Sequence, residues 1–289
     1  MIQFTIMITS TVKHLPKTTA ELEMQIPWSE IKDIYEKIFA RVASEMESTG
    51  FRKGKAPKEL VEKNINRSKI YEEVIKEIIP KAYTHALQEH KLNPVTSPKI
   101  ELSKAAEGTD WVVKTTIALK PKILLKDYKE KIKELKKGKT KIWTPGTDNK
   151  KAEDTKKPTL DEVVEVLAAN IEVELSDLLV EQETNRLLSN LLDQVQKLGL
   201  TVDQYLATKH LTSEGLRQQY SQLARKNLTV EFAIAEIAEA ENITVAQEEI
   251  DKLIAKAEKE EDKQKLRQDS YYLAHLLRQQ KTLDFLYNL

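Results

Sequence analysis

The sequence predicts an α+β N-terminal domain followed by an all-α C-terminal domain, in a chain that is elongated and mostly helical overall. Three observations lead to this fold class. The apolar pattern has period two in residues 2–26 and 99–119, whereas it has the helical period elsewhere. Glycine accounts for only seven of 289 residues, where average usage gives roughly twenty, so folds with many tight turns are disfavoured. Charged residues reach 32% and aromatic residues only 6%, which favours a thin core between long helices.

The first predicted domain, residues 1–125, begins with two strands. Apolar residues alternate with polar ones over 2–8 and again over 22–26, after a break at Pro16-Lys17. A helix is predicted from Pro27-Trp28-Ser29 to a point before Gly50, and a second over about 68–90, where Pro80 should kink or divide it. Two further strands, at 99–103 and 110–119, flank a turn at Glu107-Gly108-Thr109, and they place Trp111, Val113 and Thr115 on one face.

Residues 126–158 are rich in lysine and are predicted to form a short charged helix and a solvated linker. The last domain, 159–289, shows helical periodicity throughout, with helices predicted at about 160–170, 176–198, 212–240, 246–259 and 262–287. Thr159, Thr201 and Thr244 each stand three residues before Glu or Gln, which is the spacing of a capping box. Gly199 follows a lysine-containing turn and is predicted to end a helix.

The net charge is zero, because 46 Lys and Arg balance 46 Asp and Glu. Divided at the linker, however, residues 1–157 carry 32 basic against 22 acidic residues, and residues 158–289 carry 14 against 24. The chain is therefore predicted to have a basic half of net charge +10 and an acidic half of −10. The basic stretch of 126–141 has two interpretations, a solvated helix or a contact with RNA, and local pairing with carboxylates favours the first.

The sequence contains no recognisable catalytic, metal or cofactor site. There is no cysteine, the five histidines are scattered, and the motifs of nucleotide-binding loops and nucleophile elbows are absent. We therefore expect no catalytic residues, no metal ligands and no cofactor. No apolar run reaches the roughly 20 residues that span a bilayer, and the N-terminus lacks the basic region of a signal peptide. A cytoplasmic protein without a membrane partner is expected.

One segment combines glycines, cations and an aromatic residue between two predicted helices: Gly50-Phe51-Arg52-Lys53-Gly54-Lys55-Ala56-Pro57. The two glycines permit positive φ, and Pro57 suits the start of the next helix. Its composition alone leaves two interpretations open. The first is a docking tip, where an exposed ring and cations meet a partner, and the second is a tight turn whose phenylalanine folds back onto the core.

This run resembles the ribosome-docking signature of the trigger factor family, bacterial chaperones that act at the nascent-chain tunnel exit. Residues 92–98 and 121–123 also resemble segments of that family's N-terminal domain, and 171–289 are similar in helix order to its C-terminal domain. The resemblance implies docking on the large ribosomal subunit, at a tunnel-exit protein and nearby rRNA. The implied contacts are Phe51, Arg52, Lys53 and Lys55, in a loop shaped by Gly50, Gly54 and Pro57.

Members of that family typically carry a prolyl-isomerase domain between these two parts. Such a domain needs on the order of 100 residues, and the lysine-rich stretch of 126–158 is too short for its sheet. We therefore expect a chain that is not an enzyme. The resemblance also implies self-association, as a homodimer off the ribosome, and the division of charge gives this a physical reason.

The expected function is that of an ATP-independent chaperone that holds unfolded or nascent polypeptides. Six apolar residues of the predicted helices are candidate client contacts: Leu187, Leu191, Tyr220, Leu223, Leu276 and Leu277. Alternatively, these leucine-rich stripes simply pack against one another. The alternatives for the whole chain are a prolyl isomerase or folding factor, a periplasmic chaperone with similar helices, and an RNA-binding adaptor associated with the ribosome.

Overall fold

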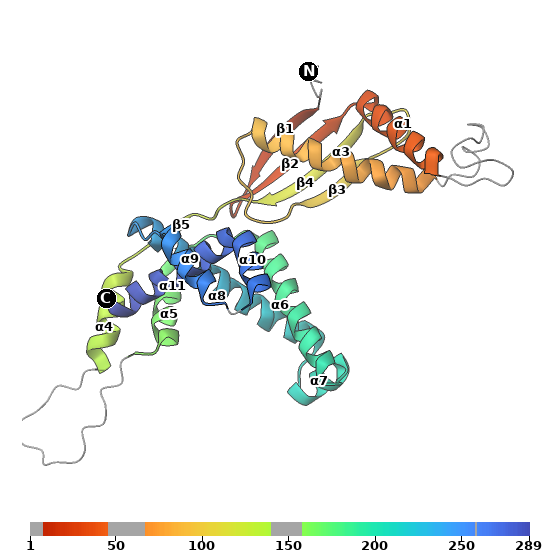
Figure 1. The fold of residues 1–289 in the computed structure, drawn as a ribbon. Coiled ribbons are helices and arrows are strands. Elements are labelled where there is room, and N and C mark those ends of the chain that lie inside the picture. The colour runs from red at the N-terminus through yellow and green to blue at the C-terminus, as the bar shows by residue number, and fades with distance from the viewer. Residues whose placement is uncertain (1–7, 46–66, 140–157, 258) are drawn as a thin grey trace, which may run out of the picture. The chain divides into compact units, whose positions relative to one another are not determined.

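The computed structural model describes residues 8–45, 67–139, 158–257 and 259–289. The chain forms two compact units, Met1–Lys120 and Pro121–Leu289, and each is described here by itself. The first unit combines an antiparallel sheet with two helices, and the second is helical apart from two short strands (Figure 1). This confirms the predicted fold class, an α+β region followed by a helical one.

The sheet of the first unit has the strand order β1-β2-β4-β3, and all neighbours are antiparallel. Its strands are β1 (Thr9–Leu15), β2 (Thr19–Ile26), β3 (Lys99–Lys104) and β4 (Trp111–Ala118). Met24 lies opposite Val113, and Ile26 lies opposite Trp111, so the alternating apolar residues of β2 and β4 share one face. Trp111, Val113 and Thr115 are all buried, as the alternation predicts. The predicted strand over 2–8 lies outside the described residues except for Ile8.

Two helices, α1 (Trp28–Glu45) and α3 (Arg67–Glu89), pack against each other and cover this apolar face of the sheet (Figure 1). The buried side chains of α1 follow the helical period, and those of α3 do the same; they are Ile31, Ile34 and Ile38, and Ile70, Val74 and Ile78. The sequence predicted that Pro80 would either kink or divide this helix, and the structure shows that it does not divide α3. Since Pro80 is exposed, the carbonyl that loses its amide partner there can bind water.

The second unit contains two short strands and eight helices in its described part. In chain order they are β5 (Ile123–Leu125), α4 (Tyr128–Lys139), α5 (Leu160–Ala169), β6 (Ile171–Val173), α6 (Asp177–Lys197), α7 (Val202–Lys209), α8 (Ser213–Ala240), α9 (Gln247–Ala255), α10 (Glu260–Gln268) and α11 (Ser270–Asn288). β5 pairs with β6 antiparallel, with Leu124 opposite Glu172. The sequence pattern did not predict this ladder, because strands of three residues are too short to show periodicity.

Helix α4 is part of the core of the second unit. Its Tyr128 and Ile132 are buried together with Val163 and Leu167 of α5, Ile237 of α8 and Leu286 of α11. The expected linker, 126–158, therefore begins with a helix that packs on this core. The reason is that α4 carries apolar residues at i and i+4, Tyr128 and Ile132, within its lysine-rich sequence.

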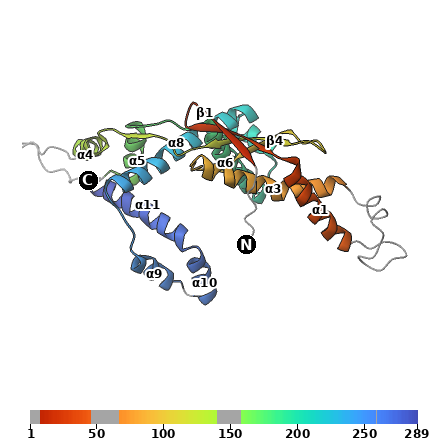
Figure 2. The same cartoon turned by 90° about the horizontal axis from the view of Figure 1, so that it is seen from above.

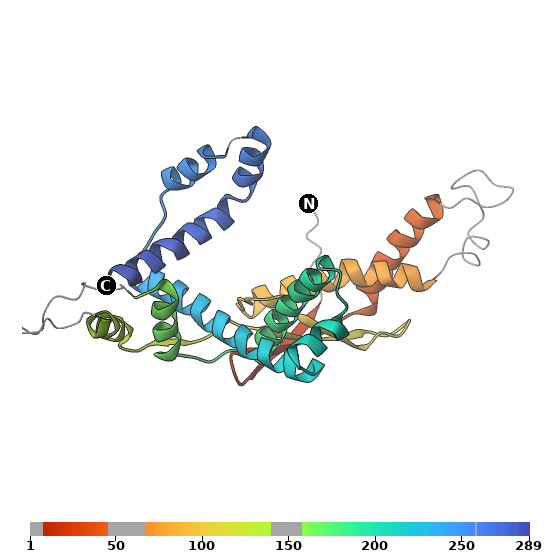
Figure 3. The same ribbon diagram turned by 90° about the horizontal axis from the view of Figure 1, so that it is seen from below.

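The remaining helices form two groups within the second unit (Figures 2 and 3). In the first group α6 packs along α8, with ion pairs between Arg217 and Glu181 and between Arg225 and Asp177, and α7 follows α6. In the second, α9, α10 and the N-terminal part of α11 share a small core of Ile250, Ile254 and Leu273. Figure 3 shows these helices, in the blue colours, as one group. The predicted helix at 262–287 is thus two helices, α10 and α11, and α7 was not predicted as a helix.

The predicted capping boxes at Thr159 and Thr201 are present, with both reciprocal hydrogen bonds of each. The one predicted at Thr244 is wrong. Helix α9 begins two residues later, and Glu249 accepts a hydrogen bond from the backbone N–H of Ala246 at 2.9 Å. Gly199 ends α6 as predicted, with a φ of +73°, and the N–H of Leu200 donates to the carbonyl of Val195.

Candidate functional site

An open groove lies on the second unit, bordered by α8, α11 and α5. It has a volume of about 450 Å³. Its lining residues come from three segments that are distant in sequence, and α8 and α11 supply all but one of them: Val164, Lys226, Asn227, Val230, Glu231, Ile234, Tyr272, His275, Leu276, Gln279 and Leu283. Because α5, α8 and α11 also share the core of this unit, the floor of the groove is held by packed helices.

The groove combines apolar and polar side chains. Val230, Ile234 and Leu283 belong to or pack against the core of the unit, whereas Leu276 is 40% exposed and Tyr272 is 60% exposed. Lys226 forms an ion pair with Glu165 at 3.2 Å, so one charge of the groove is already neutralised. Partly exposed apolar side chains beside amides and charges suit weak binding of apolar segments that keep some contact with water.

The structure brings only one of the six predicted client contacts, Leu276, into this groove. Leu277 instead packs against the small core of α9, α10 and α11. Leu223 on α8 is 43% exposed, and Leu187, Leu191 and Tyr220 are half-buried outside the groove. The other five predicted residues therefore do not line this groove, and their role in client binding stays a prediction.

Tyr271 and Tyr272 at the start of α11 were missed at the sequence level. They are 90% and 60% exposed, the two most exposed rings among the described residues with large apolar side chains. The sequence could have indicated them, because they are two adjacent aromatic residues in a chain that has few aromatic residues. The break between α10 and α11 at Asp269 places this pair in the first turn of α11, where neither ring is covered.

A second exposed apolar patch surrounds the turn between α6 and α7. Leu198 is 75% exposed, and Leu192, Leu200 and Val202 are each 42–43% exposed. Gly199 in its left-handed conformation reverses the chain at this point and leaves the leucines on either side of it open to solvent. The turn therefore presents apolar surface apart from the groove.

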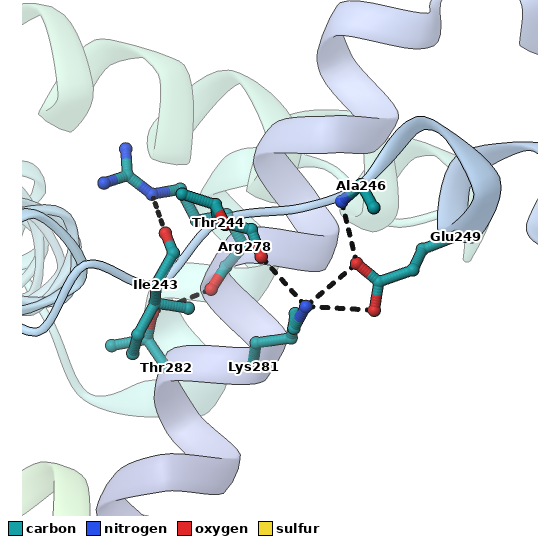
Figure 4. A network of polar contacts seen from close by, with 7 residues as sticks. All are labelled: Ile243, Thr244, Ala246, Glu249, Arg278, Lys281 and Thr282. Atoms are coloured by element: carbon teal, nitrogen blue, oxygen red, sulfur yellow. Dashed lines mark hydrogen bonds and ion pairs between the residues drawn. The ribbon is translucent and has the colours of Figure 1, made fainter.

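A polar network joins the segment before α9 to α11 (Figure 4). Lys281 Nζ donates to the backbone oxygen of Thr244 and to both carboxylate oxygens of Glu249, each at 2.9 Å. Arg278 Nε donates to the carbonyl of Ile243 at 2.9 Å. The hydrogen bond from Lys281, followed by that from the Ala246 N–H, lowers the pKa of Glu249. We refer to Lys281, Glu249 and Arg278 with these backbone groups as the clasp.

Four lysines of the basic stretch make contacts within the second unit. Lys126 pairs with Glu172, Lys129 lies 2.6 Å from Glu241, and Lys131 lies 2.9 Å from Glu134. Lys136 donates to the carbonyl of Tyr287 at 2.5 Å. Burial and the hydrogen bond to Glu241 also raise the pKa of the Tyr128 phenol, so that this hydroxyl remains a donor. These contacts favour the structural interpretation of α4 over an RNA contact.

The predicted ribosome-docking residues, Gly50 to Pro57, lie outside the described residues. Within the described ranges, no three His, Asp or Glu side chains gather closely enough to hold a metal ion. None of the helices described there has the length and apolar character needed to cross a membrane.

Family models match both parts of the chain. The model described as bacterial trigger factor protein (TF) matches residues 8–149, and that described as bacterial trigger factor protein (TF) C-terminus matches residues 131–288. Together they cover nearly the whole chain, and the second alone covers more than half of it.

Curated relatives are similar to the first part of the chain. Proteins named trigger factor from Natranaerobius thermophilus and Caldanaerobacter subterraneus are 30% and 35% identical over 122 and 120 residues. Each alignment covers 42% of this chain but only 27% and 28% of the relative, so the matched stretch spans about a quarter of these longer proteins. A solved structure, titled for promiscuous substrate recognition in folding and assembly by the trigger factor chaperone, aligns with a TM-score of 0.63 at 12% identity. That alignment covers 96% of this chain and 99% of the solved chain, and it shows a shared fold.

Proposed function

Because this chain belongs to the trigger factor family, we propose that it is an ATP-independent chaperone of the cytoplasm that docks at the ribosomal tunnel exit and holds nascent chains. The observation that carries the holding function is the open groove of α8 and α11, with its exposed Tyr272 and Leu276. The docking function rests on the signature from Gly50 to Pro57 and on the family.

The groove supports holding rather than tight, specific binding. Burial of apolar surface stabilises a complex by roughly 25 cal/mol per Å². A few half-exposed side chains bury little area, so they bind a client weakly, and the client can be released without nucleotide. The exposed patch around Leu198 offers a second, separate contact of the same kind. Two weak contacts on one chain raise the overall affinity for a long unfolded segment more than for a short one.

Replacement of Tyr272 and Leu276 by serine tests the groove. We expect binding of a permanently unfolded protein, such as reduced and carboxymethylated α-lactalbumin, to weaken by about thirtyfold, as expected when two side chains each lose on the order of 1 kcal/mol of burial. Leu124→Ser is the matched control, since Leu124 is 61% exposed but lies on β5, outside the groove. Equal affinities of the two variants, measured by fluorescence anisotropy, would contradict the assignment.

Replacement of Phe51, Arg52 and Lys53 by alanine tests the docking segment. We expect this variant to lose co-sedimentation with ribosomes at physiological salt while its helicity is unchanged. Lys99→Ala with Lys104→Ala, which removes two exposed cations from the edge strand β3 of the same unit, controls for loss of positive charge. Unchanged pelleting of the triple-alanine variant would refute docking through this segment.

We further propose that the chain has no prolyl-isomerase activity. The two family models meet and overlap in residues 131–149, so that no stretch of about 100 residues lies between the matched parts. A protease-coupled assay with a proline peptide should therefore show no acceleration above the uncatalysed rate. Acceleration that scales with protein concentration would overturn this proposal and favour the enzymatic alternative.

A further inference from the structure

Strand β3 forms an exposed edge of the sheet in the first unit (Figure 1). It pairs with β4 on one side, and in the described part of the chain no strand pairs with its other side. All six of its residues, Lys99 to Lys104, are exposed. The backbone N–H and C=O groups on that side are therefore open to water and available to another extended chain.

The regular part of this edge is short and runs from Lys99 to Leu102. The register with β4 shifts between Leu102 and Lys104, so an irregularity ends the regular stretch. Pro98 precedes the strand, and its lack of an N–H prevents the ladder from continuing in that direction. An edge of this length suits a short added strand and does not offer a long flat surface for aggregation.

The face of β3 that continues the apolar face of the sheet carries two exposed apolar side chains. Ile100 lies opposite Thr115, and Leu102 lies opposite Val113; both residues of β4 are fully buried. Ile100 and Leu102 are nevertheless 44% and 39% exposed. A further strand beside β3 places its own side chains directly opposite these two. Apolar residues at alternate positions of that strand therefore fit this face.

On the other face, charges alternate across the sheet and end at β3. Glu23 of β2 lies opposite Lys114 of β4 and pairs with it at 3.4 Å, and Lys114 lies opposite Glu101 of β3. A cation therefore fits best opposite Glu101 in the next strand, and an anion fits opposite Lys99 on the same face. Lys99 lies 3.3 Å from Glu101, but their side chains are 59% and 61% exposed, so both remain accessible to a partner.

A second copy of β3 fits this edge less well than another polypeptide does. If Ile100 of one copy lies opposite Leu102 of the other in an antiparallel pair, the two Glu101 side chains face each other and repel. The register that places Lys99 opposite Glu101 brings Pro98 opposite Leu102, where the ladder lacks a donor. The charges of the edge therefore favour a partner whose sequence reads apolar, cation, apolar, anion.

From these contacts we propose that the free edge of β3 binds extended segments of unfolded polypeptides as an added antiparallel strand. The apolar residues of the segment lie opposite Ile100 and Leu102, and its cation and anion lie opposite Glu101 and Lys99. Main-chain hydrogen bonds supply the affinity, and the alternating side chains supply the preference. The site includes neither the docking segment nor the groove of the second unit, so its test is independent of theirs.

The test uses the full chain and peptides of six residues. Acetyl-Thr-Val-Lys-Val-Glu-Thr-amide carries the proposed pattern, and two related peptides carry Lys or Glu at both charged positions. In ¹H–¹⁵N NMR titrations the patterned peptide should bind about threefold more tightly than either of the others, the effect of a cross-strand charge pair. Tighter binding of a peptide with only one kind of charge would indicate a simple attraction to net charge and would overturn the proposal.

A methylated form of the patterned peptide tests whether the segment binds as a strand. It carries N-methyl groups on Lys and on the Val that follows. Because consecutive residues of a strand direct their amides to opposite sides, one of the two methyl groups faces β3 and removes a donor. Binding should weaken by at least about tenfold. Equal binding of the two forms would mean that a side-chain surface, and not an added strand, holds the peptide.

Hydrogen exchange locates the bound peptide on the edge. In the free protein alternate amides between Lys99 and Leu102 face β4, and the others face solvent. The patterned peptide should slow exchange of the solvent-facing amides by at least about tenfold and leave the amides of α8 unchanged. Exchange that is not slowed would refute the proposal. Slowing that appears without peptide as the protein concentration rises would indicate a second copy at this edge instead.

A single substitution tests the charge pair. Glu101→Gln should weaken binding of the patterned peptide by about threefold. Glu21→Gln is the matched control, because it makes the same change on β2, away from the edge, and should have no effect. The groove variant with serine at positions 272 and 276 should bind the peptide as the native protein does. Loss of peptide binding in that variant would place the peptide in the groove and overturn the proposal.

Discussion

Single residues determine where the helices of this protein end. Gly199, His210, Asn242 and Lys91 each take a positive φ just after a helix, and in each case the next N–H bonds back to a carbonyl of the last turn. Three of the four are not glycine. Their left-handed conformation costs roughly 1–2 kcal/mol each for a residue with a Cβ, so the satisfied carbonyls and the packing that follows must outweigh that cost.

Gly199→Ala should lower the free energy of unfolding of the second unit by about 1 kcal/mol, since alanine is strained at a φ of +73°. The loss would be purely conformational, because a Cβ at this position has no neighbour within 4 Å. Gly199→Asn is the matched control, as asparagine tolerates this conformation better, and it should cost less. Urea unfolding followed by circular dichroism measures both, and equal losses would contradict the argument.

Among the elements, the group of α9, α10 and the start of α11 has only a small core of its own. Its own core has three buried residues, and the clasp joins the segment before α9 to α11. Regions with few buried contacts open locally at low free energy. The position of this group therefore depends on the clasp to a greater degree than that of α5 or α8, which lie in the main core.

Lys281→Met should increase hydrogen exchange of the α9 amides at neutral pH, because it removes the donor to Thr244 and Glu249 while keeping the aliphatic stem. The control is Lys256→Met, which changes an exposed lysine at the C-terminal end of α9 and should leave the exchange of the α9 amides unchanged. Exchange of α8 amides, in the main core, should be the same in all three proteins. If the α9 amides exchange faster in the control variant as well, or no faster in Lys281→Met than in the native protein, the clasp does not hold this helix.

The clasp should also depend on pH. The pKa of Glu249 is lowered in the folded protein, so its stabilising effect is fully present above the unfolded value and is lost as the pH falls through the folded pKa. The difference in α9 exchange between the native protein and Lys281→Met should therefore be constant near pH 7 and become smaller below about pH 4, near the ordinary pKa of a glutamate. The part that remains is due to the hydrogen bond from Lys281 to the Thr244 carbonyl, which does not titrate. A difference that is as large in acid as at pH 7 would mean that the carboxylate is not the partner that matters.

At the scale of the whole molecule, the units do not divide where the composition changes. Residues 1–120 have 19 basic and 16 acidic residues, and residues 121–289 have 27 and 30, so the units carry only +3 and −3. The net charges of +10 and −10 were obtained by counting the lysines of 126–157 with the first part of the chain. However, α4 packs in the core of the second unit, and Lys126 and Lys129 pair with carboxylates of that unit.

A fragment of residues 121–289 should therefore fold with native helicity, whereas one of residues 159–289 should melt at a lower temperature. The shorter fragment lacks Tyr128 and Ile132, whose burial contributes roughly 1.5–3 kcal/mol each, and it lacks the β5 partner of β6. Thermal unfolding followed by circular dichroism compares them. Identical melting temperatures would place the boundary at residue 158 instead.

Self-association remains a proposal, and the balance of charge determines how it should depend on salt. A head-to-tail dimer that matches a basic to an acidic surface should dissociate as ionic strength rises. Sedimentation velocity at about 50 mM and about 500 mM salt tests this, as the Debye length falls well below 10 Å over that range. A sedimentation coefficient that does not change would argue against an electrostatic dimer.

The sequence by itself determined the local features of this protein. Alternation located β2, β3 and β4, and helical periodicity located α1, α3, α5, α6, α8 and α9. The capping residues located the start of α5 and the end of α6, and the capping box at Thr201 was predicted although α7 itself was not. These features depend on neighbours within a few residues, so a sequence pattern contains them. The strongest part of the family resemblance is equally local, because the docking signature is a short run of residues, Gly50 to Pro57.

Only the tertiary structure decided which surfaces exist. The pairing of β5 with β6, the place of α4 in the second core, and the groove with Tyr272 and Leu276 all join residues that are distant in sequence. A leucine on a helical stripe, such as Leu276 or Leu277, is equally apolar whether it faces the groove or the small core. Its environment depends on which helix packs beside it, and periodicity within one helix contains no information about that neighbour.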